Sequence, residues 1–271
     1  MRYWIVLFSS FVASAAGLRP TATLSLDNGY AQMYNVEFGE AHKTFDAWKK
    51  THPDDPMAPV SDAAAYLFAE FERLHVLQSE FFTDDVEFKS GPKMTPDPGV
   101  KDVFLKRLDE CDHLADGILA HDATNKNAQF AKILAMGLRC NYMAMIEKRY
   151  VASLSYMKAA RTRAQALLAK DSSFYDAYTA LGIENYMLGV RSTPVRLMLS
   201  VTGAKTSKSE GLRDLKVAAA QGHYLEPFAR LLLAVAALRD KDKNTAREYL
   251  AGLSKEFPKN KLYARELARL N

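Results

Sequence analysis

The most constraining feature of this chain is a spaced apolar pattern that occurs once near each end. In both places a small residue is followed, at intervals of 4, 3 and 5 residues, by a large apolar residue, a second apolar residue and a proline. The two occurrences are Ala41, Phe45, Trp48 and Pro53, and Ala246, Leu250, Leu253 and Pro258. The spacing puts the apolar residues on one face of a helix, and proline ends that helix because it lacks an N–H donor and clashes with the preceding turn. The pattern therefore predicts paired helices at both ends of the chain.

This pattern resembles the second helix of a tetratricopeptide repeat. The first helix of that repeat is matched by Tyr178, Leu181 and Gly182, and in the last unit Leu233 and Ala234 precede Ala246 at the expected interval. The resemblance implies an all-α, right-handed solenoid in which each helical hairpin buries its apolar face on its neighbours.

Reading outward from these anchors predicts a repeat domain over residues 22–271, with five hairpins and a C-terminal capping helix. The hairpins are expected at 22–52, 58–121, 127–171, 173–221 and 225–257, and the cap from Lys261 to Leu270. In the second hairpin we expect a long first helix, to about Phe82, and then a flexible loop near 83–100 that is rich in proline and glycine. The fourth hairpin carries an insertion at 190–207.

The fourth hairpin also resembles the insertion of Iml2/TTC39-type tetratricopeptide proteins over about 30 residues. The matching residues are Gly189, Leu197-Met198-Leu199-Ser200, Gly203, Gly211-Leu212 and Leu215. This second resemblance implies only another helical scaffold.

The first 15 residues have the composition of a signal peptide. Arg2 precedes an apolar run from Tyr3 to Val12, and Ala13-Ser14-Ala15 provides small residues for cleavage. The run is shorter than the roughly 20 residues that cross a bilayer. We expect a periplasmic or secreted protein with no membrane span after cleavage.

The overall charge argues against a nucleic-acid partner. Lysine and arginine number 36, aspartate and glutamate 32, and the two signs are interspersed rather than gathered on one basic face.

In tetratricopeptide repeats the first helix of each hairpin lines the inside of the superhelix. Carried onto this chain, those positions predict an apolar partner groove that also includes Ala64, Phe228 and Leu238. Its principal residues are Leu67, Phe68, Leu134, Leu138, Asn141, Tyr142, Thr179, Ile183, Tyr186, Met187, Leu231 and Val235. Ordinary packing between helices, or cover by the insertion at 190–207, explains such a lining equally well.

The two cysteines leave two interpretations open. Cys111 and Cys140 fall on consecutive helices that run antiparallel about a turn near residue 124, so a disulfide is within geometric reach, and two buried thiols are the alternative.

Two Glu-x-x-His pairs, Glu72 with His75 and Glu110 with His113, have the spacing of di-metal helical bundles. No further inward glutamates complete such a site, so we expect no metal, no cofactor and no catalytic residues. The favoured hypothesis is an exported, non-catalytic scaffold that binds a protein or peptide along the apolar groove. The alternative is a carrier for an apolar small molecule, and a di-metal enzyme is the remote third.

Overall fold

The computed structural model describes residues 25–76, 94–189 and 207–270. Within these ranges the regular structure is entirely helical, with eleven α-helices packed in adjacent pairs and no strand. The all-α prediction is therefore confirmed for the described part of the chain.

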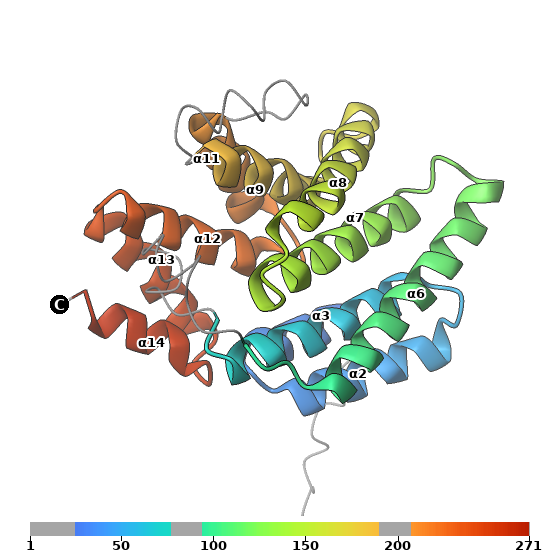
Figure 1. The fold of residues 1–271 in the computed structure, drawn as a ribbon, viewed down its shortest axis with the longest axis horizontal. Helices are drawn as coiled ribbons and strands as arrows, with labels where there is room; N and C mark the ends of the chain where they lie inside the picture. Colours follow the sequence, from blue (N-terminus) through green and yellow to red (C-terminus); the bar gives the residue numbers. More distant parts are fainter. Residues whose placement is uncertain (1–24, 77–93, 190–206, 271) are drawn as a thin grey trace, which may run out of the picture.

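The helices form the five predicted hairpins and the cap (Figure 1). The pairs are α1 (Leu26–Tyr34) with α2 (Phe38–Thr51), α3 (Met57–Arg73) with α6 (Pro98–His121), α7 (Lys126–Asn141) with α8 (Tyr150–Lys170), α9 (Tyr178–Gly189) with α11 (Lys208–Gln221), and α12 (Glu226–Arg239) with α13 (Lys243–Glu256). The cap is α14 (Lys261–Ala268). A π-helical segment, η1 (Tyr142–Ile146), follows α7, and a short 3₁₀ turn, η2 (Tyr175–Ala177), precedes α9.

Local signals set many of the helix ends. Side chains at six N-termini accept a hydrogen bond from a backbone N–H two or three residues further on, which satisfies donors that the helix leaves unpaired. These capping residues are Ser25, Asp97, Asn125, Ser207, Asp242 and Asn260. Pro53 and Pro258 each come two residues after a helix has ended.

The repeated apolar pattern lies in the core. Ala41 and Phe45 in α2, like Ala246, Leu250 and Leu253 in α13, are almost completely buried. Phe45 lies over Gly29 of α1, where an added Cβ would come within 2.7 Å of the ring. Phe45 thus fills the space that Gly29 leaves between the paired helices.

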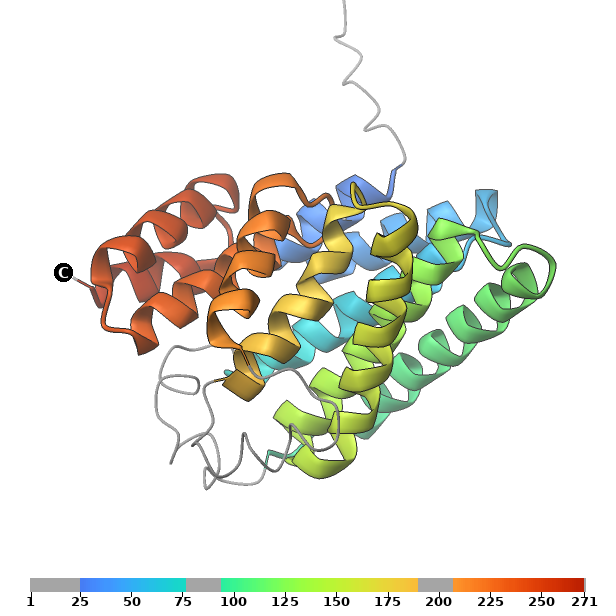
Figure 2. The ribbon, with the colours of Figure 1, turned by 90° about the horizontal axis from the view of Figure 1, so that it is seen from above.

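The chain curves round until its last hairpin meets its first (Figures 1 and 2). The Tyr34 hydroxyl of α1 donates to the carbonyl oxygen of Tyr224 at 2.9 Å, and the rings of Tyr30 and Tyr224 stack with centroids 4.6 Å apart. Phe257 packs on Tyr34, and Lys259 pairs with Glu37. These contacts close the array into a ring among the described residues.

One predicted boundary is wrong. The first helix of the second hairpin ends at Arg73 rather than near Phe82, because the backbone turns out of the helix at His75, which has φ 57°. The predicted signal peptide, most of the 83–100 loop and nearly all of the 190–207 insertion lie outside the described residues. None of the described helices combines the length and apolar character needed to cross a membrane.

Candidate functional site: a central cavity

The first helices of the five hairpins meet around a cavity of about 70 Å³ that is partly open to solvent. Its walls come from α1, α3, α7, the start of α9 and the segment that leads into α12. The lining residues are Tyr30, Met33, Tyr34, Val60, Ala64, Phe68, Ile133, Leu134, Gly137, Leu138, Asn141, Asp176, Thr179, Ala180, Ile183, Leu225 and Phe228. Most of these side chains are apolar.

Gly137 opens this cavity on the α7 side. A Cβ added at Gly137 would have no atom of the described residues within 4 Å, although the residue lies well inside a helix. By contrast, a Cβ at Gly182 would approach Leu215 Cγ to 2.7 Å, so that glycine serves close packing. A glycine inside a helix costs about 0.5–1 kcal/mol relative to alanine. At Gly137 no neighbouring helix among the described residues requires a glycine for close packing. The missing side chain instead leaves open space in the cavity.

Aromatic side chains form the opposite wall. The rings of Phe68 and Phe228 meet edge to face with centroids 5.6 Å apart, and Tyr34 approaches Phe68 in the same manner at 6.0 Å. Burial raises the pKa values of the Tyr30 and Tyr34 hydroxyls well above their ordinary value. Both hydroxyls have protein partners, since Tyr30 accepts from Ser61 at 3.0 Å and Tyr34 donates to Tyr224.

Asp176 holds the segment that leads into α12. Its carboxylate accepts hydrogen bonds from three consecutive backbone N–H groups, of His223 at 2.8 Å, Tyr224 at 3.0 Å and Leu225 at 3.1 Å. Charge-assisted bonds of this kind are about twice as strong as neutral ones. A carboxylate of the protein itself therefore engages the amide groups just before this helix.

Thr179, in the first turn of α9, is one of the residues that line the cavity. The residue is 2% exposed, and its Oγ1 is buried with no hydrogen-bond partner among the described residues. A buried hydroxyl without a partner costs about 1–3 kcal/mol. Such groups are rare enough in folded proteins that each calls for an explanation.

The structure brings about half of the predicted groove residues to the cavity. Those that line it are Ala64, Phe68, Leu134, Leu138, Asn141, Thr179, Ile183 and Phe228, and those that do not are Leu67, Tyr142, Tyr186, Met187, Leu231, Val235 and Leu238. Phe228, in the first turn of α12, is the last residue of that helix in the cavity wall. Leu231 and Val235, further along α12, are buried away from the cavity. Tyr186 lies on the face of α9 that contacts Gly211 of α11. Leu67, in α3, is part of the hydrophobic core.

Tyr142 leaves the groove because α7 passes into the π-helical segment η1 at that residue. Its ring stacks on Phe104 of α6, with centroids 5.1 Å apart, and burial raises the pKa of its hydroxyl to about 12. Sequence reasoning missed Tyr30, Met33 and Tyr34, which reach the cavity only because the ring closes. It also missed Gly137 and Asp176.

The cysteines are free and buried. Cys111 lies against α7, with its Sγ 3.7 Å from the Ala131 carbonyl oxygen, whereas a hydrogen bond with Ser153 places Cys140 on the side of α8. The two thiols thus face different neighbours, and the structure has the buried-thiol alternative rather than the disulfide. Burial raises the pKa of Cys111 to about 12 and that of Cys140 to about 11.

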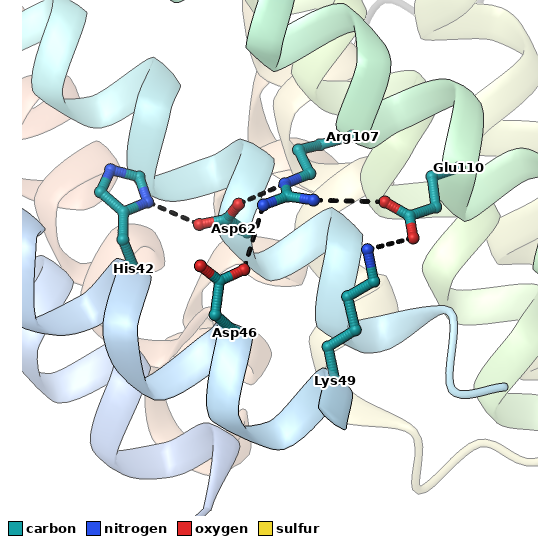
Figure 3. Close-up of polar contacts among 6 residues, drawn as sticks. All are labelled: His42, Asp46, Lys49, Asp62, Arg107 and Glu110. Carbon is teal, nitrogen blue, oxygen red and sulfur yellow. Dashed lines mark hydrogen bonds and ion pairs between the residues drawn. The ribbon is translucent and has the colours of Figure 1, made fainter. Parts of the chain in front are cut away.

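Away from the cavity, a cluster of charged and polar side chains joins α2, α3 and α6 (Figure 3). The Asp62 carboxylate is 2.5 Å from His42 Nδ1 and 2.6 Å from Arg107 Nε, and Arg107 also reaches Asp46 at 3.0 Å. His42 packs on the Tyr66 ring, at a centroid distance of 4.0 Å. Because Asp62 contacts both His42 and Arg107, the cluster holds the first and second hairpins together.

Glu110, from one of the two Glu-x-x-His pairs, belongs to this cluster. It pairs with Lys49 of α2 and lies 3.4 Å from Arg107, so both of its carboxylate oxygens already have cationic partners. No group of three or more His, Cys, Asp or Glu side chains suited to a metal ion occurs in the described ranges.

No protein-family model matches the chain, and no curated protein or solved structure is significantly similar to it. The family resemblance therefore rests on the sequence pattern and on the paired packing of the helices.

Proposed function

We propose that this chain is an exported, non-catalytic, tetratricopeptide-like protein that binds a small, largely apolar molecule in its central cavity. The observation that carries the proposal is the cavity itself, where the first helices of the hairpins present apolar side chains around the open space at Gly137. We further propose that the hairpins follow the right-handed superhelix of that family.

The size of the cavity favours a small molecule over a docked helix. An engineered protein cavity of about 150 Å³ holds benzene, and an α-helix with its side chains is about 10–12 Å across. The space here is about 70 Å³, and aromatic side chains of the closed ring form one wall. A helix would enter only if the contacts of Tyr30 and Tyr34 with Tyr224 and Phe257 separated.

A protein partner is the second candidate function, and the partial opening of the cavity to solvent favours it. A single apolar side chain of a partner would fit the same space in the closed ring. We propose this as a scaffold function in which one anchor residue, rather than a whole helix, enters the cavity.

The test uses two glycines that both have open space beside them. Gly137→Leu adds a side chain into the cavity, whereas Gly117→Leu adds the same atoms to an exposed position of α6. Xenon is the probe, because dry apolar cavities bind it without needing a polar group. We expect NMR shifts of cavity methyl groups on xenon addition in the wild type and in Gly117→Leu, and their loss in Gly137→Leu.

Native mass spectrometry of the same three proteins separates the two candidates. A small-mass adduct lost only in Gly137→Leu supports the small molecule, and a polypeptide adduct lost in the same way supports the anchor residue. Xenon shifts that are identical in all three proteins would show that the cavity is not a binding site. Intact mass of exported protein, shortened by residues 1–15, tests the export.

A further inference from the structure

We infer that Asp176 is a positioning residue that sets the size limit of the central cavity, so that the cavity admits an apolar group smaller than benzene. This inference rests on the proposed function. It adds the size class of the ligand and names the residue that fixes it. It follows from the way in which one wall of the cavity is held.

The wall that comes from the fifth hairpin is held by the fourth. Leu225, just before α12, and Phe228, in its first turn, both line the cavity. The backbone N–H groups of residues 223–225 donate to the carboxylate of Asp176, which belongs to the turn η2 that precedes α9. Phe228 follows three residues later at the start of the helix, so Asp176 positions both wall residues.

The packing around Asp176 is close. The residue is buried, its Oδ1 accepts from the N–H groups of His223 and Leu225, and its Oδ2 accepts from that of Tyr224. A Cβ added at Gly222 would lie 2.9 Å from Asp176 Oδ1, so the absence of a side chain there permits the carboxylate to approach the segment.

The same segment is tied to the first hairpin. The Tyr224 carbonyl oxygen accepts the hydroxyl of Tyr34, and the Tyr224 ring stacks on Tyr30. Tyr30 and Tyr34 themselves line the cavity. An outward movement of Leu225 would therefore strain its bond to Asp176 and the contacts of Tyr224 with α1.

This fixed wall limits the size of what enters. The space is about 70 Å³, whereas an engineered cavity that holds benzene measures about 150 Å³. Benzene would have to displace the wall against the charge-assisted bonds of Asp176. Xenon, a single atom, needs no such displacement. A longer molecule would insert only a small apolar end through the side that is open to solvent.

Asp176→Asn tests the inference, with xenon and benzene each titrated by NMR into the full chain. The asparagine amide has one acceptor oxygen, and its NH₂ group would oppose an N–H of the segment, so at least one of the three bonds is lost. We expect benzene affinity to rise at least about ten-fold, the effect of one charge-assisted hydrogen bond, and xenon affinity to stay unchanged.

The matched control is Asp171→Asn. Asp171 accepts the N–H of Ser173 at 3.0 Å in the same connection between α8 and α9, but it does not line the cavity. Both affinities should equal those of the wild type. A general loss of structure would weaken both ligands, so a rise confined to benzene reports the size of the cavity.

Gly222→Ala is the second variant, for use if Asp176→Asn does not fold. Its Cβ would lie 2.4 Å from the Ala218 carbonyl oxygen as well as 2.9 Å from Asp176 Oδ1, so the segment and the carboxylate must separate. Benzene affinity should rise here too. Benzene binding that is equally tight in the wild type and the variants, with xenon bound to all, would overturn the inference and leave the proposed function intact. Absence of xenon binding in the wild type would overturn both.

Discussion

The second hairpin, α3–α6, and the fourth, α9–α11, bury equivalent carboxylates in opposite ways. Glu70 in α3 and Glu184 in α9 are both 2% exposed. Glu70 accepts two N–H groups of Arg73, at 2.8 and 2.7 Å, and the backbone N–H of Asp97 at 2.9 Å. Glu184 faces Arg161 with its Oε2 3.2 Å from Nε, yet that oxygen has no well-aligned hydrogen bond. The hydrogen bonds of Arg73 lower the pKa of Glu70, whereas burial raises that of Glu184.

Glycines differ between the same two hairpins. A Cβ on Gly211 of α11 would lie 2.8 Å from the Cα of Tyr186 and 2.9 Å from the carbonyl oxygen of Gly182, so the backbones of α9 and α11 are in contact there. A Cβ on Gly117 of α6 would have no atom within 4 Å. The second hairpin is therefore stabilised by matched charges and the fourth by close backbone packing. That close packing leaves polar groups such as Glu184 and Asp214 buried with weak partners.

The largest predicted effect is at the backbone contact of the fourth hairpin. Gly211→Ala places a methyl group against the backbone of Tyr186, which cannot rotate away, so the two helices must separate. Overpacking of this kind costs about 1–3 kcal/mol, and a clash with backbone belongs at the upper end of that range. Urea unfolding followed by circular dichroism measures the loss, and wild-type stability in this variant would contradict the close contact.

Removing the charge of Glu70 tests the matched carboxylate of the second hairpin. Glu70→Gln keeps the shape but loses the charge-assisted bonds to Arg73, and should cost about 2 kcal/mol at pH 7. The matched control is Glu72→Gln, on the same helix and only half-buried. Equal urea midpoints for the two variants would show that the Arg73 pair contributes nothing.

The same substitution in the fourth hairpin should have the opposite sign. Burial raises the pKa of Glu184 although the charges of Arg161 and Lys158 lie near it, so Glu184→Gln should relieve the cost of that buried charge and raise the free energy of unfolding slightly at pH 7. Urea unfolding beside Glu70→Gln makes the comparison direct. A loss of stability as large as that of Glu70→Gln would mean that Arg161 matches Glu184 well.

The pH dependence of these two variants separates the hairpins further. Because the folded-state pKa of Glu70 is lowered, the advantage of the wild type over Glu70→Gln is complete above the ordinary value of 4.5 and disappears as pH falls through the lowered pKa. Because that of Glu184 is raised, the disadvantage of the wild type against Glu184→Gln is complete at neutral pH. It disappears as pH falls through the raised pKa to below 4.5. Urea midpoints between pH 7 and pH 3 measure both differences, and parallel profiles would contradict the contrast.

The hairpins were predictable because their signals are local. The spacing of Ala41 and Phe45 and the prolines after the helices depend on neighbours within a few turns, as do the capping side chains. Closure of the ring was not predictable, since the contact of Tyr34 with Tyr224 joins residues 190 positions apart and depends on the summed curvature of all the hairpins.

The cavity shows the same difference between features that local sequence signals predict and features that depend on distant residues. The groove positions implied by the tetratricopeptide resemblance include Leu134, Leu138 and Ile183, and these three residues line the cavity. Gly182, which is packed against Leu215, belongs to the tetratricopeptide pattern, whereas no motif marks Gly137, which has open space beside it among the described residues. That difference depends on the neighbouring helix and emerges only in three dimensions.

The smallest predicted effect completes the comparison of glycines. Gly117→Ala adds a methyl group to an exposed position inside α6, where no atom opposes it. Alanine loses less conformational entropy on folding and favours the helix, so stability should rise by about 0.5–1 kcal/mol. The gain has the opposite sign to the loss expected in Gly211→Ala, although the chemical change is identical. A loss of stability in Gly117→Ala, measured by urea unfolding, would show that α6 also needs a glycine for close packing, and the contrast between the two hairpins would fail.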